Sequence, residues 1–85
     1  TFGTIQKLVN LYLKYLWVAG LLGEKQPQHC PIDRGVLNQI HWKGKPWTQM
    51  NREDYEYAIE EISKIAKAKK ESIAEWELRN WPFSK

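Results

Sequence analysis

The sequence is poor in the residues that carry metal and redox chemistry. Its 85 residues include one cysteine, Cys30, and two histidines, His29 and His41. A single cysteine excludes an intrachain disulfide, which suits a reducing compartment such as the cytoplasm. A structural zinc site needs four ligands in a tetrahedron, and these three residues lack the usual C-x2-C or H-x3-H spacing. We therefore expect no metal ion and no cofactor.

A strong excess of charge of one sign is also missing. The chain carries 13 Lys and Arg against 10 Asp and Glu, a formal net charge of +3. Dedicated nucleic-acid-binding domains carry a clearer basic excess. The most apolar stretch, residues 2–19, is long enough to span a membrane, but Gln6, Lys7, Asn10 and Lys14 interrupt it, which argues against a lipid-facing segment. We expect no membrane insertion.

Helical periodicity covers most of the chain, and no alternating strand pattern competes with it. We predict one all-α domain spanning residues 1–85, a small bundle of four helices. The expected helices are residues 2–19, 31–41, 52–69 and 73–80. Ser72 and Glu75 form a capping box before the fourth helix. Thr48 or Asn51 caps the third helix, and Asn51 with Asp54 resembles a capping box.

The first of these stretches has an unusually wide apolar surface. Its polar residues gather in one narrow arc on a helical wheel: Gly3, Gln6, Lys7, Asn10 and Lys14. Apolar and aromatic residues cover roughly 220° of the wheel, whereas a surface helix needs a stripe of only about 100°. We predict that this helix is the central strut, covered on two sides, and that its surplus apolar surface pairs with a second copy in a homodimer. We expect the polar arc to be solvated; alternatively, Gln6 and Asn10 point into a pocket or a partner.

Four stretches of the sequence resemble one group of small bacterial proteins. They are FGTIQKLVNLYLKYLW, PQHCPIDRGVL, PWTQM and SIAEWELRNW. They span nearly the whole chain, and the hexapeptide HCPIDR is the most specific of them. The group consists of open reading frames of mobile genetic elements and integron cassettes, without an assigned activity. The resemblance implies a bacterial, cytoplasmic protein and no catalytic residue. It also implies residues before the FG, and Thr1 lies directly inside a helical pattern with no evident cap, as expected of a fragment.

Residues 29–34 are the sharpest candidate for covalent chemistry. If Pro31 opens the second helix, Cys30 lies at a helix N-terminus, where the thiolate is stabilised. His29 and Asp33 would then assist a nucleophilic or redox cysteine. The alternative is structural, because a free cysteine is commonly buried and Asp33 can form ion pairs with neighbouring elements. We favour the structural role, and with it a protein that is not an enzyme.

A loop rich in tryptophan and lysine, residues 41–48, is the second candidate site. Its functional candidates are Trp42, Lys43, Lys45 and Trp47. Aromatic rings that stack on bases and cations that neutralise phosphates are combined in proteins that bind single strands. A lysine run from Lys64 to Lys70 would extend the basic surface. The alternative is that both tryptophans cover the core between the second and third helices.

These observations rank three functions. A binding protein that self-associates through its first helix comes first, with Gln6 and Asn10 as further candidate contacts. A nucleic-acid-binding accessory protein that uses the loop of residues 41–48 comes second. A small enzyme or redox protein that uses Cys30 comes third, because no catalytic spacing supports it.

Overall fold

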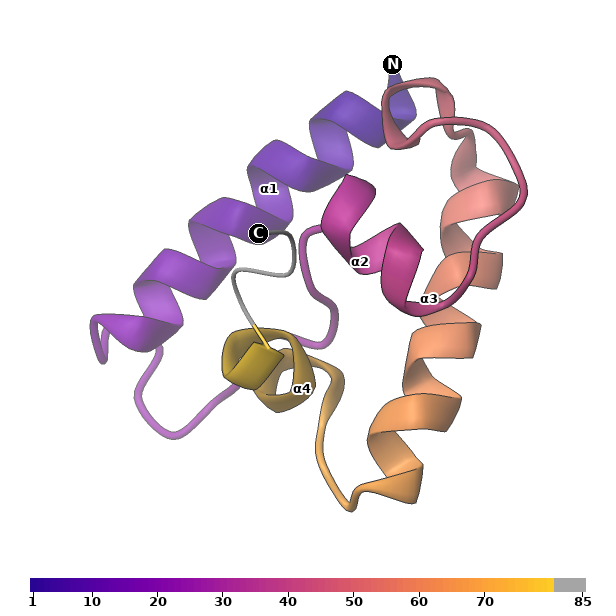
Figure 1. Cartoon of the computed structure of the whole chain (residues 1–85). Coiled ribbons are helices and arrows are strands. Elements are labelled where there is room, and N and C mark those ends of the chain that lie inside the picture. Colours follow the sequence, from indigo (N-terminus) through magenta and orange to yellow (C-terminus); the bar gives the residue numbers. More distant parts are fainter. Residues whose placement is uncertain (81–85) are drawn as a thin grey trace.

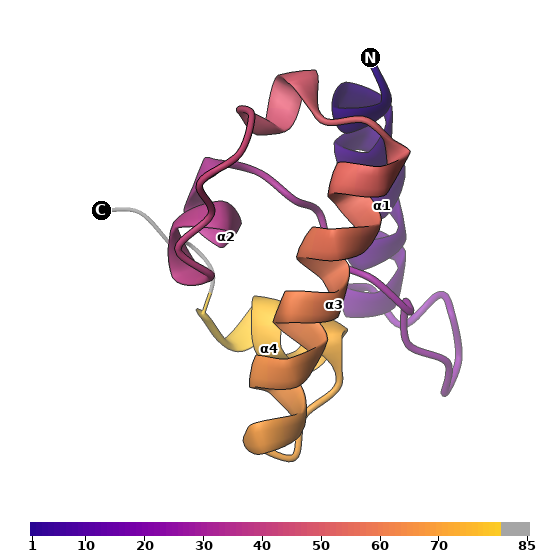
Figure 2. The ribbon, with the colours of Figure 1, turned by 90° about the vertical axis from the view of Figure 1, so that its right-hand side faces the viewer.

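The computed structural model describes residues 1–80, and the regular structure of this part is entirely helical. The elements are α1 (Phe2–Val18), α2 (Arg34–Gln39), the 3-10 turn η1 (Trp47–Gln49), α3 (Arg52–Ala68) and α4 (Ile73–Asn80). Figure 1 shows α1 and α3 close together near the N-terminus and diverging from there, with α4 in the opening between them. The quarter turn in Figure 2 places α2 on one side of this pair. Within these residues, the prediction of a small all-α bundle of four helices is confirmed.

The hydrophobic core is built without α1. Its buried members are Cys30, Ile32, Val36, Leu37, Met50, Tyr55, Ala58, Ile62, Ala66 and Trp76. They come from α2, α3, α4 and the segments that precede α2 and α3. Among residues 1–80, no side chain of α1 belongs to this cluster or to the partly buried residues packed against it. The expectation that the first helix is the apolar strut of the domain is therefore wrong.

The starts of α3 and α4 follow the predicted capping boxes. Asn51 Oδ1 accepts from the Asp54 amide at 2.9 Å, and Asp54 Oδ2 accepts from the Asn51 amide at 3.2 Å. Ser72 Oγ and Glu75 Oε1 make the same reciprocal pair at 3.1 and 2.9 Å. Each box satisfies amides that have no partner within the helix.

Helix α2 is shorter than predicted. It begins at Arg34, and Asp33 is its N-cap, with Oδ1 accepting from the Val36 amide at 3.2 Å. Cys30 and Pro31 lie in the preceding segment, which has no regular structure. The expectation that Pro31 opens this helix and that Cys30 lies at its N-terminus is wrong. Asp33 is the N-cap, so the helix begins three residues after Pro31.

Both ends of α1 are defined by local chemistry. Thr1 is its N-cap and accepts from the Thr4 amide at 3.2 Å, so the apparent lack of a cap in the sequence was misleading. At the other end Gly20 has φ of 79°, the left-handed conformation expected after a helix. The first turn also lies directly on η1, since a Cβ at Gly3 would come within 1.7 Å of the Trp47 carbonyl oxygen.

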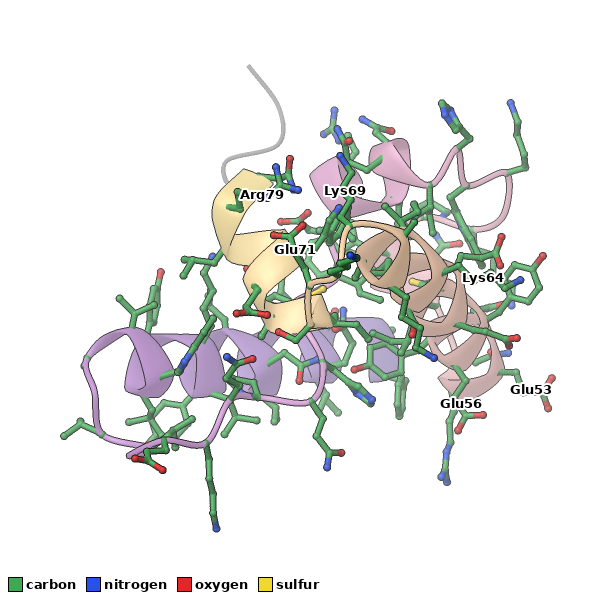
Figure 3. All side chains as sticks on the ribbon, turned by 90° about the horizontal axis from the view of Figure 1, so that it is seen from below. Glu53, Glu56, Lys64, Lys69, Glu71 and Arg79 are labelled. Atoms are coloured by element: carbon green, nitrogen blue, oxygen red, sulfur yellow. The ribbon has the colours of Figure 1, made fainter. Side chains whose placement is uncertain are left out.

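The outer surfaces of α3 and α4 are charged. Figure 3 shows Glu53, Glu56, Lys64 and Lys69 projecting from α3 and the turn that follows it. Arg79 of α4 donates to Glu71 through Nε and Nη2 at 2.8 and 2.7 Å. These two elements therefore present charge to solvent, as a surface helix ordinarily does.

Candidate functional site

The polar arc of α1 faces the rest of the chain. Four residues of this helix are buried: Gly3, Gln6, Asn10 and Lys14, hereafter the inner stripe. The expectation of a solvated arc is wrong for these residues. Their side chains are directed at other elements of the same chain, and each of the three polar ones has a specific partner there.

Gln6 holds the irregular segment before α2. Its Nε2 donates to the Ile32 carbonyl oxygen at 2.8 Å, and its Oε1 accepts from the Ile32 amide at 3.2 Å. Ile32 is fully buried and lies outside any helix, so its backbone groups require partners from elsewhere. The amide of Gln6 supplies both, which explains why a polar residue lies at this buried position.

Asn10 continues the inner stripe into a hydrogen-bonded network. Its Nδ2 donates to Gln6 Oε1 at 3.2 Å and to Tyr55 Oη at 2.9 Å. Tyr55 Oη lies 2.7 Å from His29 Nδ1, and since Asn10 already donates to this oxygen, the hydroxyl proton is available to the histidine. Burial lowers the pKa of His29, and burial raises the pKa of Tyr55 to about 12, although the Asn10 hydrogen bond opposes that rise. The network is therefore built from neutral groups at pH 7.

Lys14 and Glu77 form a buried ion pair between α1 and α4. Lys14 Nζ lies 3.1 Å from Glu77 Oε2, and their side chains are 6% and 4% exposed. Burial raises the pKa of Glu77, and the hydrogen bond from Lys14 opposes this rise. Glu77 is tolerated inside because Lys14 supplies the opposite charge that a buried carboxylate requires.

The apolar side of α1 is exposed. We call the following residues the outer face: Phe2 (38% exposed), Ile5 (61%), Leu8 (64%), Val9 (52%), Tyr12 (64%), Tyr15 (56%) and Val18 (59%). Residues 1–80 therefore do not cover α1 on two sides. Tyr12 and Tyr15 lie on this surface and not in the core.

The centre of the outer face has the spacing of a coiled-coil seam. Ile5, Leu8, Tyr12 and Tyr15 follow one another at intervals of three, four and three residues, the a and d positions of a heptad. Val9 and Val18 lie beside this seam, and no residue of the outer face is charged. This spacing can be read from the sequence. It distinguishes the residues at the centre of the outer face from the other apolar residues of the helix, which the wide apolar arc alone does not do. Within residues 1–80, no helix has both the length and the apolar character to cross a membrane.

The candidate cysteine site lacks the geometry of a nucleophile. Cys30 is 1% exposed, and burial raises the pKa of its thiol, with the negative charges of Glu77 and Asp33 acting in the same direction. His29 Nδ1 is engaged with Tyr55, and Asp33 caps α2 and lies 3.6 Å from Lys7 Nζ. In the part of the chain described, no three His, Cys, Asp or Glu side chains are grouped to hold a metal ion.

The tryptophan loop is divided between the core and the surface. Trp42 and Trp47 are partly buried against the core, as the structural alternative predicted. Both also line an open hollow of about 440 Å³ together with Arg34 and Lys45. Lys45 lies 3.4 Å from Asp54, so its charge is partly neutralised.

The lysine run does not extend this basic surface. Lys64 and Lys69 belong to the C-terminal part of α3 and the turn after it, whereas residues 41–48 precede its N-terminus. A helix of this length separates its ends by about 25 Å. The structure thus brings together Trp42, Trp47 and Lys45 but leaves the lysine run elsewhere.

Comparisons with protein-family models, with curated proteins and with solved structures give no match to this chain.

Proposed function

We propose that this protein is a non-enzymatic interaction module that self-associates through the outer face of α1. The observation that supports this is the orientation of α1. Its polar side chains Gln6, Asn10 and Lys14 are buried, whereas its apolar residues, such as Ile5, Leu8 and Tyr12, are exposed. A helix that kept its apolar side in water without a partner would forfeit the main stabilising term available to it.

The size of the outer face suits a specific interface. Standard complexes bury about 800 Å² on each partner, which is about one seventh of this chain's surface of 5844 Å². The outer face has seven large apolar side chains, six of them more than half exposed, along a 17-residue helix. Contiguous apolar patches of more than a few hundred Å² are uncommon on monomers and mark interaction sites.

A second copy of the same chain is the occupant that these residues favour. The seam of Ile5, Leu8, Tyr12 and Tyr15 has the spacing by which one helix packs its side chains between those of another. A two-fold axis would place apolar surface against apolar surface, and the uncharged face requires no complementary charge from a different partner. The tyrosine hydroxyls can remain in water at the edge of such an interface.

The oligomeric state in solution tests this proposal. We expect light scattering after size exclusion to give twice the monomer mass for the wild type, and the monomer mass for Leu8→Glu and for Tyr12→Glu. Leu78→Glu is the matched control, because Leu78 is an exposed leucine on α4 and should leave the dimer intact. Circular dichroism checks that each variant is folded. A folded wild-type protein that remains monomeric at millimolar concentration would overturn the proposal.

The other two functions have less support. Cys30 is buried and its thiol pKa is raised, which disfavours a reactive cysteine. The loop that was a candidate for nucleic acid has Lys45 beside Asp54, and the lysine run lies at the other end of α3. A bacterial and cytoplasmic origin remains a proposal that rests on the sequence resemblance.

A further inference from the structure

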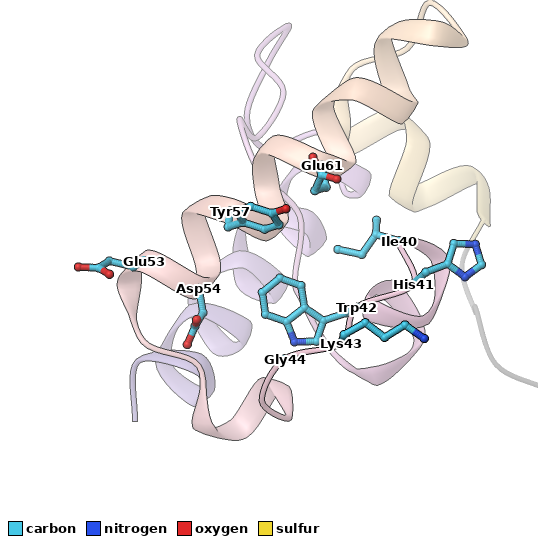
Figure 4. A pocket seen from close by; sticks show the side chains of 9 residues that line it. All are labelled: Ile40, His41, Trp42, Lys43, Gly44, Glu53, Asp54, Tyr57 and Glu61. Carbon is cyan, nitrogen blue, oxygen red and sulfur yellow. The ribbon is translucent and has the colours of Figure 1, made fainter.

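A second surface feature lies away from α1, between α3 and the loop after α2. It is an open pocket of about 580 Å³. Figure 4 shows the rings of Trp42 and Tyr57 in this pocket, with Ile40 beside them. The two ring centroids are 5.9 Å apart and the ring planes make an angle of 58°. Tyr57 is 59% exposed, so its ring contributes little to the core.

The pocket is edged by carboxylates. Glu53, Tyr57 and Glu61 follow one another at four-residue intervals, which places them on one face of α3. Asp54 also lines the pocket. Lys43 and His41 are part of the lining, but their side chains point away from the two rings in Figure 4. In Figure 4 the Glu53 side chain also points away from the two rings, so Asp54 and Glu61 are the remaining acidic members of the lining.

The three carboxylates differ in how they are paired with other groups of the chain. Asp54 has its own partners, the Asn51 amide at 3.2 Å and Lys45 Nζ at 3.4 Å. Glu61 pairs with Lys64 at 2.9 Å, and the Lys64 side chain is 68% exposed, so water screens this pair and a bound cation can compete with it. Glu53 takes part in no ion pair within residues 1–80.

The indole of Trp42 is held in place by its own loop. Its Nε1 donates to the Lys45 carbonyl oxygen at 2.8 Å. The backbone of Gly44 packs on the indole so closely that a Cβ there would lie 2.7 Å from Cζ2. A ligand that stacks on this ring does not have to immobilise it first, and this reduces the entropy lost on binding.

We propose that this pocket binds a methylated ammonium group. A cation within about 6 Å of the face of a tryptophan or tyrosine ring is attracted by the ring quadrupole. The carboxylate of Glu61, which also lines the pocket, adds an electrostatic attraction for a cation. The apolar surfaces of Ile40, Trp42 and Tyr57 suit methyl groups, whereas an unmodified lysine ammonium is strongly hydrated. A small quaternary amine and a methylated lysine of a peptide share this chemistry. The site uses no residue of α1, so it does not depend on self-association.

Titration followed by NMR of the tryptophan indole N–H groups tests the proposal. Choline is the first probe, and its uncharged isostere 3,3-dimethylbutan-1-ol is the control ligand. We expect choline to shift the Trp42 indole signal, assigned with Trp42→Phe, in a saturable manner, while the alcohol gives no saturation. Tyr57→Leu and Glu61→Gln should each weaken choline binding by about three- to thirtyfold. A trimethyl-lysine peptide that binds more tightly than choline would identify a protein as the source of the group, and the reverse order a small amine.

Glu60→Gln is the matched control variant. Glu60 is an exposed carboxylate on α3, adjacent in sequence to Glu61, and it does not line the pocket. The Glu60→Gln variant should bind choline as tightly as the wild type does. The absence of a saturable shift with both choline and the peptide would overturn the proposal, as would equal binding of the uncharged alcohol. Unchanged affinity in both Tyr57→Leu and Glu61→Gln would do the same, because both side chains are exposed enough to replace without unfolding the protein.

Discussion

Helices α1 and α3 have the same length of 17 residues, yet they bury opposite kinds of side chain. α3 turns Tyr55, Ala58 and Ile62 inward and charged residues outward. α1 turns Gln6, Asn10 and Lys14 inward and its apolar residues outward. Amphipathicity alone therefore identifies two faces of a helix, but not which of them the fold covers.

The difference follows from what each helix packs against. α3 contacts the apolar core, which accepts methyl groups and rings. α1 faces the irregular segment at Ile32, the hydroxyl of Tyr55 and the carboxylate of Glu77, and these groups require hydrogen bonds when they are buried. Directional polar contacts fix α1 on the domain, and its apolar side chains are exposed.

Breaking the buried ion pair should have the largest effect on this arrangement. Lys14→Met leaves Glu77 as a buried, unpaired carboxylate, and we expect a loss of about 3–5 kcal/mol in the free energy of unfolding. The double variant Lys14→Met with Glu77→Leu should recover most of it, since an apolar pair of similar volume is often neutral. Urea denaturation measures both.

The exposed pair of Lys64 and Glu61 provides the control for this prediction. Lys64→Met should cost far less than Lys14→Met, because solvent screens this pair. An equal cost for Lys14→Met and Lys64→Met would show that the inner stripe does not hold α1 in place.

The close approach of α1 to η1 gives the next largest effect. In Gly3→Ala the new Cβ would fall 1.7 Å from the Trp47 carbonyl oxygen, so the backbone has to shift. We expect a destabilisation of about 1–3 kcal/mol, or somewhat more if η1 cannot move. Thermal unfolding at low protein concentration measures it.

Val9→Ala is the matched substitution on the outer face. Val9 is 52% exposed, and at concentrations where the protein is monomeric its truncation should change stability by less than about 0.5 kcal/mol. A larger loss for Val9→Ala than for Gly3→Ala would reverse the assignment of inner and outer sides.

The sequence was sufficient to predict the four helices and the capping boxes of α3 and α4, because these depend on local patterns. Asn51 with Asp54, and Ser72 with Glu75, are read directly from their spacing. It was insufficient for the orientation of α1, which depends on Tyr55 and Glu77, residues 45 and 63 positions away from their partners. No local pattern shows that Ile32 needs two hydrogen bonds from a side chain.

The same difference between a local pattern and a tertiary contact applies to the loop of residues 41–48. Trp42 was recognised from its sequence neighbours Lys43 and Lys45, which suggested a basic, phosphate-binding loop. The fold instead sets its ring beside Tyr57, in a pocket that Glu61 also lines. Their four-residue spacing in α3 was visible, but the approach of the loop to this face is a tertiary contact.

The smallest expected effect is a pH dependence of the inner network. Burial lowers the pKa of His29 below its ordinary value of 6.5, so the unfolded chain binds the proton more readily than the folded one. The stabilisation is complete above pH 6.5, and it is lost as the pH falls from 6.5 through the folded-state pKa. Protonated Nδ1 would donate to Tyr55 Oη, which already accepts from Asn10, and the tyrosine hydroxyl would lose its acceptor. Urea midpoints measured from pH 7.5 to 5.5 should therefore decrease.

Replacing His29 by asparagine separates the pH dependence of this network from that of other titrating groups. In His29→Asn the side-chain oxygen can still accept from Tyr55 but does not titrate, so the decrease between pH 7.5 and 5.5 should become shallower. His41→Asn should keep the wild-type slope, because His41 is exposed and outside the network. If His29→Asn retains the full slope, the network is not the titrating unit, and the buried face of α1 is then held by Gln6 and the Lys14–Glu77 pair without a contribution from His29.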